Sequence, residues 1–191
     1  MVLSFKLYRL IYKIYRRAKF LLSVLVKGGD IFIVDIDNTV ANTFPLLLQD
    51  SCLKLVYQRA NCFSNVVDFI NEQRHAGKAV FFLSARDSQY YKVTEDWLNR
   101  NVFGGFNELL LVSSANEKLI YLKLLVFCKK KVFYIDDLSY GHETGTVRYF
   151  DNLIRRVSEL PIVYIGYPEL RRLHESEKLK LVIVESKFVI I

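Results

Sequence analysis

Cysteine is scarce in this sequence, with three residues in 191: Cys52, Cys62 and Cys128. None belongs to a C-x-x-C pair and their number is odd, so the chain offers neither a disulfide framework nor a zinc site. We therefore expect a reducing compartment and a cytoplasmic protein. The 52% of hydrophobic residues is enough for one domain with a sizeable core.

Long hydrophobic runs are also missing near the N-terminus. The longest uncharged apolar stretch there, residues 20–26, falls far short of the roughly 20 residues that a membrane-spanning helix needs. A secretory signal is not expected either, because the basic region is long and residues 27–30 (Lys-Gly-Gly-Asp) do not form a small-residue cleavage site. We expect this segment to stay on the mature protein.

Acidic residues are nearly absent from the first 30 residues. This segment contains seven basic residues and only Asp30 as an acid, so it carries +6 of the total net charge of +7. At 100° per residue, the basic residues at 6, 9, 13, 16 and 17 share one arc of a helix, and apolar residues take the other faces. The spacing predicts a basic amphipathic helix over residues 5–26, within a segment 1–27 that precedes a domain at 28–191.

Two roles of this helix stay open. Residues 5–26 can lie on an anionic bilayer, at the inner face of a membrane. Alternatively, the helix packs on the domain or on a partner, and an oligomer is left open. The residues after position 30 carry a net charge of only +1, which argues against nucleic acid as a partner, because binding a phosphate backbone requires a basic surface near the site.

Short apolar runs alternate with helical patterns through the rest of the chain. Strands are expected at residues 31–34, 79–83, 108–112, 131–135 and 161–166. Helices are expected at residues 45–59, 65–75, 88–101, 116–127 and 146–158. This alternation predicts an α/β fold with a three-layer, doubly wound parallel sheet. The β-branched tail, residues 179–191, adds one or two strands whose role the sequence does not reveal.

Polar side chains follow the first strand in the order Asp35-Ile36-Asp37-Asn38-Thr39. They fall at the carboxyl edge of a central parallel strand, where open α/β sheets bind their ligands. Three further patterns come in order: Ser84-Ala85-Arg86 after the second strand, Lys118 in a helix, and Asp136-Asp137 after the fourth strand. Each pattern alone is common, but together and in this order they indicate one site.

These four patterns, spanning Ile31 to Asp137, resemble the motifs of the haloacid dehalogenase superfamily. Thr94 and Trp97 give a loose similarity to its acid-phosphatase-like and polynucleotide kinase-phosphatase-like branches. The resemblance implies a Rossmann-like fold and a Mg²⁺-dependent phosphoric monoester hydrolase. An acid at position 37 favours a phosphatase over a dehalogenase or a P-type ATPase, which lack it.

The resemblance also assigns catalytic roles. Asp35 is the nucleophile that attacks phosphorus in line and forms an aspartyl-phosphate. Asp37 is the general acid that protonates the departing alkoxide and then the base that activates water. Ser84 donates a hydrogen bond to a phosphoryl oxygen, and Lys118 places a positive charge against that group.

A Mg²⁺ site follows from the same resemblance. Its ligands are the carboxylate of Asp35, the backbone carbonyl of Asp37 and an acid of the Asp136/Asp137 pair, all hard oxygen donors. Asp136 is favoured as the direct ligand. His142, shortly after this pair, either lines the site or lies at the surface.

Thr39, Ala85 and Arg86 are expected to contact the substrate. For Arg86, a structural ion pair is an equally good alternative. Simpler roles also exist for two catalytic candidates, since Ser84 can cap the following helix and Lys118 can be an ordinary surface residue.

The spacing between the motifs leaves room for little or no cap domain, which predicts an open site and a bulky phosphorylated substrate. Two alternatives to a metabolic or cell-envelope phosphatase stay open. One is a phosphatase acting on nucleic-acid ends. The other is a non-catalytic protein that keeps the fold and binds a partner, which the joint presence of all four motifs disfavours.

Overall fold

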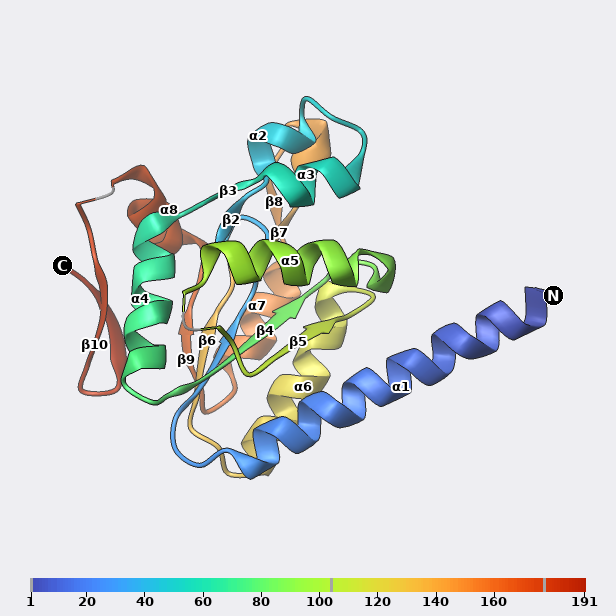
Figure 1. Cartoon of the computed structure of the whole chain (residues 1–191). Coiled ribbons are helices and arrows are strands. Elements are labelled where there is room, and N and C mark those ends of the chain that lie inside the picture. Colours follow the sequence, from blue (N-terminus) through green and yellow to red (C-terminus); the bar gives the residue numbers. More distant parts are fainter. Residues whose placement is uncertain (1, 104, 177) are drawn as a thin grey trace.

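The computed structural model describes residues 2–103, 105–176 and 178–191. Five strands form one parallel sheet in the order β5-β4-β1-β6-β9 (Figure 1). Their bounds are β1 Ile31–Val34, β4 Ala79–Ser84, β5 Glu108–Leu111, β6 Val132–Ile135 and β9 Val163–Ile165. The first strand is central, because it pairs with both β4 and β6. The predicted parallel sheet is confirmed.

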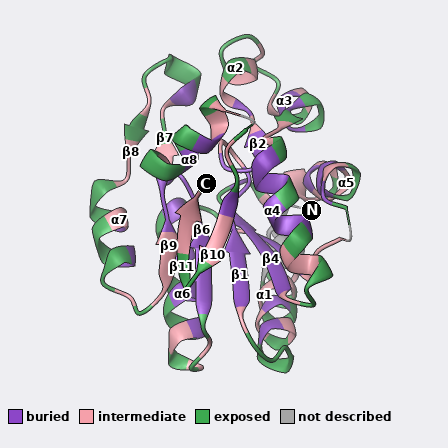
Figure 2. Ribbon diagram, turned by 90° about the vertical axis from the view of Figure 1, so that its left-hand side faces the viewer, coloured by how far each residue is buried: buried purple, intermediate pink, exposed green. Residues whose placement is uncertain are grey.

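Helices cover both faces of this sheet. One face carries α1 (Val2–Val26), α6 (Ala115–Phe127) and α7 (Asp151–Ser158), and the other carries α4 (Ser64–His75), α5 (Tyr91–Asn101) and α8 (Tyr167–Glu175). Figure 2 shows the buried strands enclosed between helices whose outer surfaces are exposed. The fold is therefore the predicted three-layer, Rossmann-like α/β arrangement.

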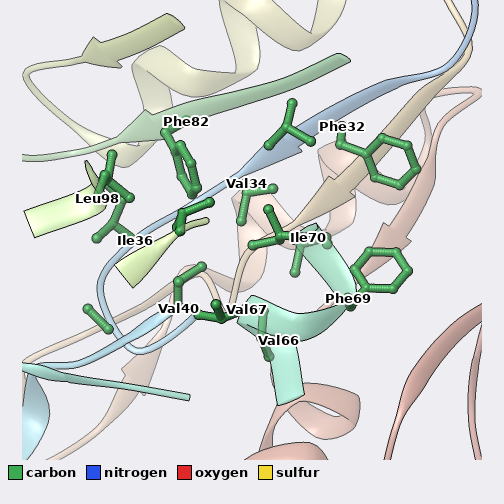
Figure 3. Close-up of a cluster of buried hydrophobic side chains, with 14 of the residues drawn as sticks. Phe32, Val34, Ile36, Val40, Val66, Val67, Phe69, Ile70, Phe82 and Leu98 are labelled. Carbon is green, nitrogen blue, oxygen red and sulfur yellow. The ribbon is translucent and has the colours of Figure 1, made fainter. Parts of the chain in front are cut away.

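The core is divided by the sheet because successive residues of a strand point to opposite faces. In β1, Ile31 and Ile33 join the cluster under α1, α6 and α7. Phe32 and Val34 join the opposite cluster with α4, α5 and α8 (Figure 3). All four residues are buried, as expected for a strand covered on both faces.

The structure corrects the predicted helix at 45–59, which is two helices, α2 (Phe44–Leu47) and α3 (Leu53–Arg59), between the paired short strands β2 (Ala41–Asn42) and β3 (Asn61–Cys62). The break occurs where the Asp50 carboxylate accepts a hydrogen bond from the Cys52 amide at 2.8 Å. Such local side-chain bonds favour a turn over a continuous helix.

The predicted helix at 146–158 begins later, as α7 at residue 151. The preceding residues form β8 (Arg148–Tyr149), which pairs with β7 (Ser139–Tyr140), and the short 3₁₀ helix η2 (His142–Thr144) lies between them. A second 3₁₀ helix, η1 (Ser88–Tyr90), precedes α5. Helix α8 was not expected from the sequence.

The C-terminal tail forms a hairpin of β10 (Leu181–Val184) and β11 (Lys187–Ile190), which confirms the predicted strands. Phe188 packs edge-on against Phe69 of α4 and Phe133 of β6, with ring centroids 5.9 and 5.7 Å away. The hairpin thus closes the core beside α4. In the part of the chain that the structure describes, no helix is long and apolar enough to cross a membrane.

Candidate active site

The motifs meet in a cavity of about 320 Å³ at the carboxyl edge of the sheet. Its wall is formed by the segments that follow β1, β4 and β6 and by the first turn of α6. Because the strands are parallel, their carboxyl ends converge at one edge (Figure 1). The fold therefore brings together residues that are more than a hundred positions apart in the sequence.

A tight turn after β1 presents the two aspartates. The carbonyl of Ile36 accepts hydrogen bonds from the amides of Val40 and Ala41, at 3.0 and 2.8 Å. Asn38 has a φ of 53°, a left-handed conformation that asparagine tolerates better than most residues. The turn reverses the chain directly behind Asp35 and Asp37, so both side chains line the cavity.

Lys118 connects two of the acids. Its ammonium group lies 2.7 Å from Oδ1 of Asp35 and 2.7 Å from Oδ2 of Asp136. Oxygens of Asp35, Asp136 and Asp137 all lie within 4.8 Å of one another. Three ionised carboxylates and one ammonium leave two negative charges in a buried space, which is unfavourable unless a cation compensates them.

The pKa values reflect this excess of negative charge. Burial and the neighbouring Asp136 raise the pKa of Asp35 to about 7, although Lys118 acts in the opposite direction. Burial, Asp136 and Asp35 also raise the pKa of Asp137. Clustered carboxylate oxygens with surplus negative charge suit a hard divalent cation, so the residues present fit the predicted metal site.

Asp136 and Asp137 differ in the number of hydrogen bonds that their carboxylate oxygens already accept. The Asp136 carboxylate accepts hydrogen bonds from Lys118, from the Tyr134 hydroxyl and from the Leu138 amide. Asp137 accepts from the Ser139 hydroxyl, and its Oδ1 lies 3.5 Å from the Thr39 hydroxyl. Asp137 therefore keeps more free acceptor capacity, whereas the sequence favoured Asp136 as the direct ligand.

Asp37 is paired with Arg86 rather than with the other acids. The guanidinium donates two hydrogen bonds of 2.8 Å to the two carboxylate oxygens. It also donates to Thr94 Oγ1 at 3.0 Å and lies 3.9 Å from the ring centroid of Tyr57. Burial alone would raise the pKa of Asp37, but the charge and hydrogen bonds of Arg86 outweigh it and lower the pKa.

The three residues expected to contact substrate are placed differently. Ala85 lines the cavity, whereas Thr39 and Arg86 are buried and do not. The Thr39 hydroxyl accepts a hydrogen bond from the Asp137 amide at 3.2 Å. Thr39 and Arg86 thus each hold an aspartate of the site in place, and for Arg86 the ion-pair alternative is the one that the structure contains.

Ser84 lies at the end of β4 and lines the cavity. Its hydroxyl oxygen is buried and has no hydrogen-bond partner among the described residues. A buried hydroxyl without a partner is unfavourable by about 1–3 kcal/mol. It is therefore a donor available to a ligand in the cavity.

Sequence reasoning did not find part of the wall. Asn116, Tyr140 and Phe150 line the cavity together with His142, which the sequence left open. His142 Nε2 lies 2.6 Å from the Ser139 hydroxyl oxygen. The only available signal was proximity to the acidic pair, because Tyr140 and Phe150 reach the site through the β7–β8 pairing, which no motif marks.

No protein-family model and no curated protein sequence matches this chain. Among solved structures, it is similar to the class C acid phosphatase from Bacillus anthracis with tungstate bound, at 17% identity and a TM-score of 0.46, over 63% of this chain and 56% of that chain. It is also similar to a structure of the Pnkp1/Rnl/Hen1 complex, at 19% identity and a TM-score of 0.49, over 74% and 47%.

A structure of the Pnkp1/Rnl/Hen1 RNA repair complex gives 20% identity and a TM-score of 0.48, over 73% of this chain and 43% of that chain. The chain thus spans about half the length of the solved structures it matches.

Proposed function

We propose that this chain is a Mg²⁺-dependent phosphatase that hydrolyses a phosphate monoester through an aspartyl-phosphate on Asp35. The observation that carries the proposal is the buried cluster of Asp35, Lys118, Asp136 and Asp137 beside a partnerless Ser84 hydroxyl. A non-catalytic scaffold has no need of this arrangement, because burying these groups opposes folding.

In the first step, a carboxylate oxygen of Asp35 forms a bond to phosphorus while the bond to the departing alkoxide breaks. Ser84 would donate a hydrogen bond to one phosphoryl oxygen, and Lys118 would hold the nucleophile and balance the phosphoryl charge. The first turn of α6 also lines the cavity, and the backbone amides at a helix N-terminus favour a bound anion.

In the second step, water attacks the phosphorus and the bond to Asp35 breaks. Asp37 would accept the proton of this water, after giving a proton to the leaving alkoxide in the first step. Arg86 favours the ionised carboxylate, so this geometry prepares Asp37 as the base. Its two parallel hydrogen bonds also fix the direction in which the carboxylate points.

The carboxylates of Asp35 and Asp137, with Asp136 beside them and the backbone carbonyl of Asp37, would hold Mg²⁺. When bound, Mg²⁺ offsets the repulsion between a phosphate dianion and the nucleophile. The surplus of two negative charges in the metal-free cluster is what makes these residues suited to a divalent ion.

Another part of the cavity wall would meet the leaving group. It contains the aromatic side chains of Tyr140 and Phe150, whose ring centroids are 4.5 Å apart, together with His142 and Asn116. The elements α2, α3 and η2 near this end of the sheet are short, which would leave the cavity open to a bulky group. A substrate larger than a simple sugar phosphate fits an opening of this kind.

The test is phosphate release from a panel of esters, with and without Mg²⁺. The panel contains sugar phosphates, nucleotides, phosphorylated DNA and RNA ends, and lipid phosphates. We expect Mg²⁺-dependent release from at least one member, and a loss of roughly 10⁴-fold or more in Asp35→Asn, because that variant lacks the nucleophile. Asp96→Asn, which changes an aspartate on the outer side of α5, is the matched control.

Retention of most activity in Asp35→Asn would contradict the assigned nucleophile. Phosphate release from nucleic-acid ends alone would select the alternative function. No release from any ester in the presence of Mg²⁺, by a protein that binds the ion, would favour the non-catalytic protein.

A further inference from the structure

Helix α1 is attached to the domain by its polar side. Arg16 donates to Glu108 of β5 at 2.6 Å, and Lys19 lies 2.7 Å from the other oxygen of the same carboxylate. Arg17 pairs with Glu117 of α6. These three basic residues are therefore paired with two acids of the domain, which the predicted basic arc did not anticipate.

Two apolar residues complete this attachment. Phe20 and Val24 are buried, and the Phe20 ring packs edge-on against Phe81 and Tyr121, with centroids 5.4 and 5.8 Å away. Phe20 lies on the same side of the helix as Arg16 and Arg17. Between Arg16 and Val24, the domain thus already occupies the charged side of α1.

Among the described side chains, the opposite side of α1 is mostly apolar and exposed between Leu7 and Leu25, although Leu21 in the same arc is partly buried against the domain. At 100° per residue, its other large apolar residues occupy one arc of about 140°. Each of them is 49–61% exposed, and they are Leu7, Leu10, Ile11, Ile14, Tyr15, Leu22 and Leu25. We call this set the apolar face of α1. A contiguous apolar surface of this extent marks an interaction site rather than ordinary surface.

The charge of the segment indicates what this face contacts. Residues 1–29 contain seven basic residues and no acidic one. Among the described side chains of the segment, Arg16, Arg17 and Lys19 form ion pairs with the domain and Lys27 forms none. The side chains of Lys6, Arg9 and Lys13 lie outside the described residues, but their sequence positions place three positive charges on the N-terminal part of α1.

We propose that the apolar face of α1 lies in the surface of an anionic lipid bilayer and anchors the domain to it as a peripheral protein. An amphipathic helix of this kind buries its apolar side at the boundary between headgroups and acyl chains, while basic residues are attracted to anionic headgroups. The N-terminal part of α1 extends away from the domain (Figure 1), so it reaches a flat surface without obstruction.

A second copy of the chain fits this face less well. A two-stranded coiled coil uses a narrow seam of a and d positions, flanked by residues of opposite charge on the two helices. The apolar face is wider than such a seam, and the segment has no acidic residue to pair with the basic residues of a partner helix. Two copies of α1 side by side would repel each other, whereas an anionic surface attracts them.

The experiment is sedimentation of the full chain with vesicles of phosphatidylcholine alone and with vesicles that also contain phosphatidylserine. We expect binding to the anionic vesicles that weakens with added salt. Ile11→Gln combined with Ile14→Gln should lower the affinity roughly tenfold or more, because two large apolar side chains are lost from the bilayer contact. Lys6→Gln, Arg9→Gln and Lys13→Gln should each lower it about fivefold.

The matched control is Ile120→Gln with Leu124→Gln, which removes two exposed apolar side chains from α6 and should leave binding unchanged. Equal binding by the Ile11/Ile14 variant, or equal binding to neutral and anionic vesicles, would overturn the proposal. So would a reversible dimer that forms without lipid and is lost in the same variant. Phosphate release from a soluble ester is measured in parallel, and its outcome is independent of the outcome with vesicles.

Discussion

The site and helix α1 depart from the usual distribution of side chains in opposite ways. At the carboxyl edge of the sheet, Asp35, Lys118 and Asp136 are charged groups that are almost fully buried. In α1, by contrast, large apolar residues such as Leu10 and Ile14 are more than half exposed. Both arrangements lower the stability of the isolated chain relative to one with charges outside and apolar groups inside.

The comparison shows that each region is incomplete in a different sense. The site has a surplus of negative charge, so a cation, and an anionic group bound to that cation, would complete it. The helix has a surplus of apolar surface together with positive charge, so the proposed bilayer, apolar inside and negatively charged at its surface, would complete it. On this interpretation, substitutions in the site change stability and phosphate release, whereas substitutions in the apolar face of α1 change neither.

The largest effect on stability is expected at Asp35. Its pKa is about 7 in the folded, metal-free protein and 3.8 by reference, so between these two pH values the folded state holds a proton that the unfolded state has released. The free energy of unfolding therefore falls as pH rises from about 4 to about 7, by up to roughly 4 kcal/mol from this group.

Asp35→Asn removes the ionisable group and should make the metal-free protein more stable than the wild type. We expect the advantage to be small near pH 4 and to grow to a few kcal/mol at pH 8, as measured by urea unfolding in the presence of a chelator. Adding Mg²⁺ should stabilise the wild type more than the variant. If the variant were more stable than the wild type by the same amount at every pH, the raised pKa of Asp35 would be contradicted.

The next effect is expected at Arg86. Arg86→Gln removes both hydrogen bonds to Asp37 and the positive charge that favours its ionised form. We expect kcat to fall about a hundredfold with little change in KM, because Arg86 positions Asp37 for proton transfer and does not contact the substrate. Arg86→Lys should not restore the rate, because an ammonium group cannot form the two parallel bonds. Full activity of the lysine variant would show that a positive charge beside Asp37 is enough and that the two parallel hydrogen bonds are not required.

The smallest effect is expected in α1. Combined Ile11→Gln and Ile14→Gln should change the free energy of unfolding by no more than about 0.5 kcal/mol, because both side chains are already exposed. Phe20→Ala, on the opposite side of the same helix, should lower it by about 3–5 kcal/mol. Denaturant unfolding of both variants measures the difference directly. A large destabilisation by the isoleucine pair would mean that the apolar face packs on the protein itself.

Much of the fold was predictable, because each strand of the sheet is a short apolar run between turn signals. Val34 and Ile135 each end such a run immediately before an aspartate, which fixed the position of the site. The errors arose where a local bond competes with helix formation, as at Asp50, or where distant segments pair, as at Arg148. Helix α8 was missed, although Pro168 in its first turn is a known helix-start signal.

The roles of the individual site residues were less predictable than the location of the site at the edge of the sheet. The sequence places Arg86 two residues after Ser84, but it does not show that the guanidinium turns toward Asp37. That orientation depends on Thr94 of α5 and Tyr57 of α3, which contact Arg86 only in the folded chain. Motif spacing identifies residues that share an edge of the sheet, whereas side-chain contacts decide which of them face the cavity.

Trp97 is the only tryptophan in the chain, and it is buried in α5. Its indole nitrogen donates to the carbonyl of Ala60 at 2.7 Å, at the C-terminal end of α3. This bond joins the two helices that hold Arg86, one through Thr94 and the other through Tyr57. The protein therefore has a single tryptophan behind the Asp37–Arg86 ion pair, and emission excited selectively from that indole reports movement of these helices without an added label.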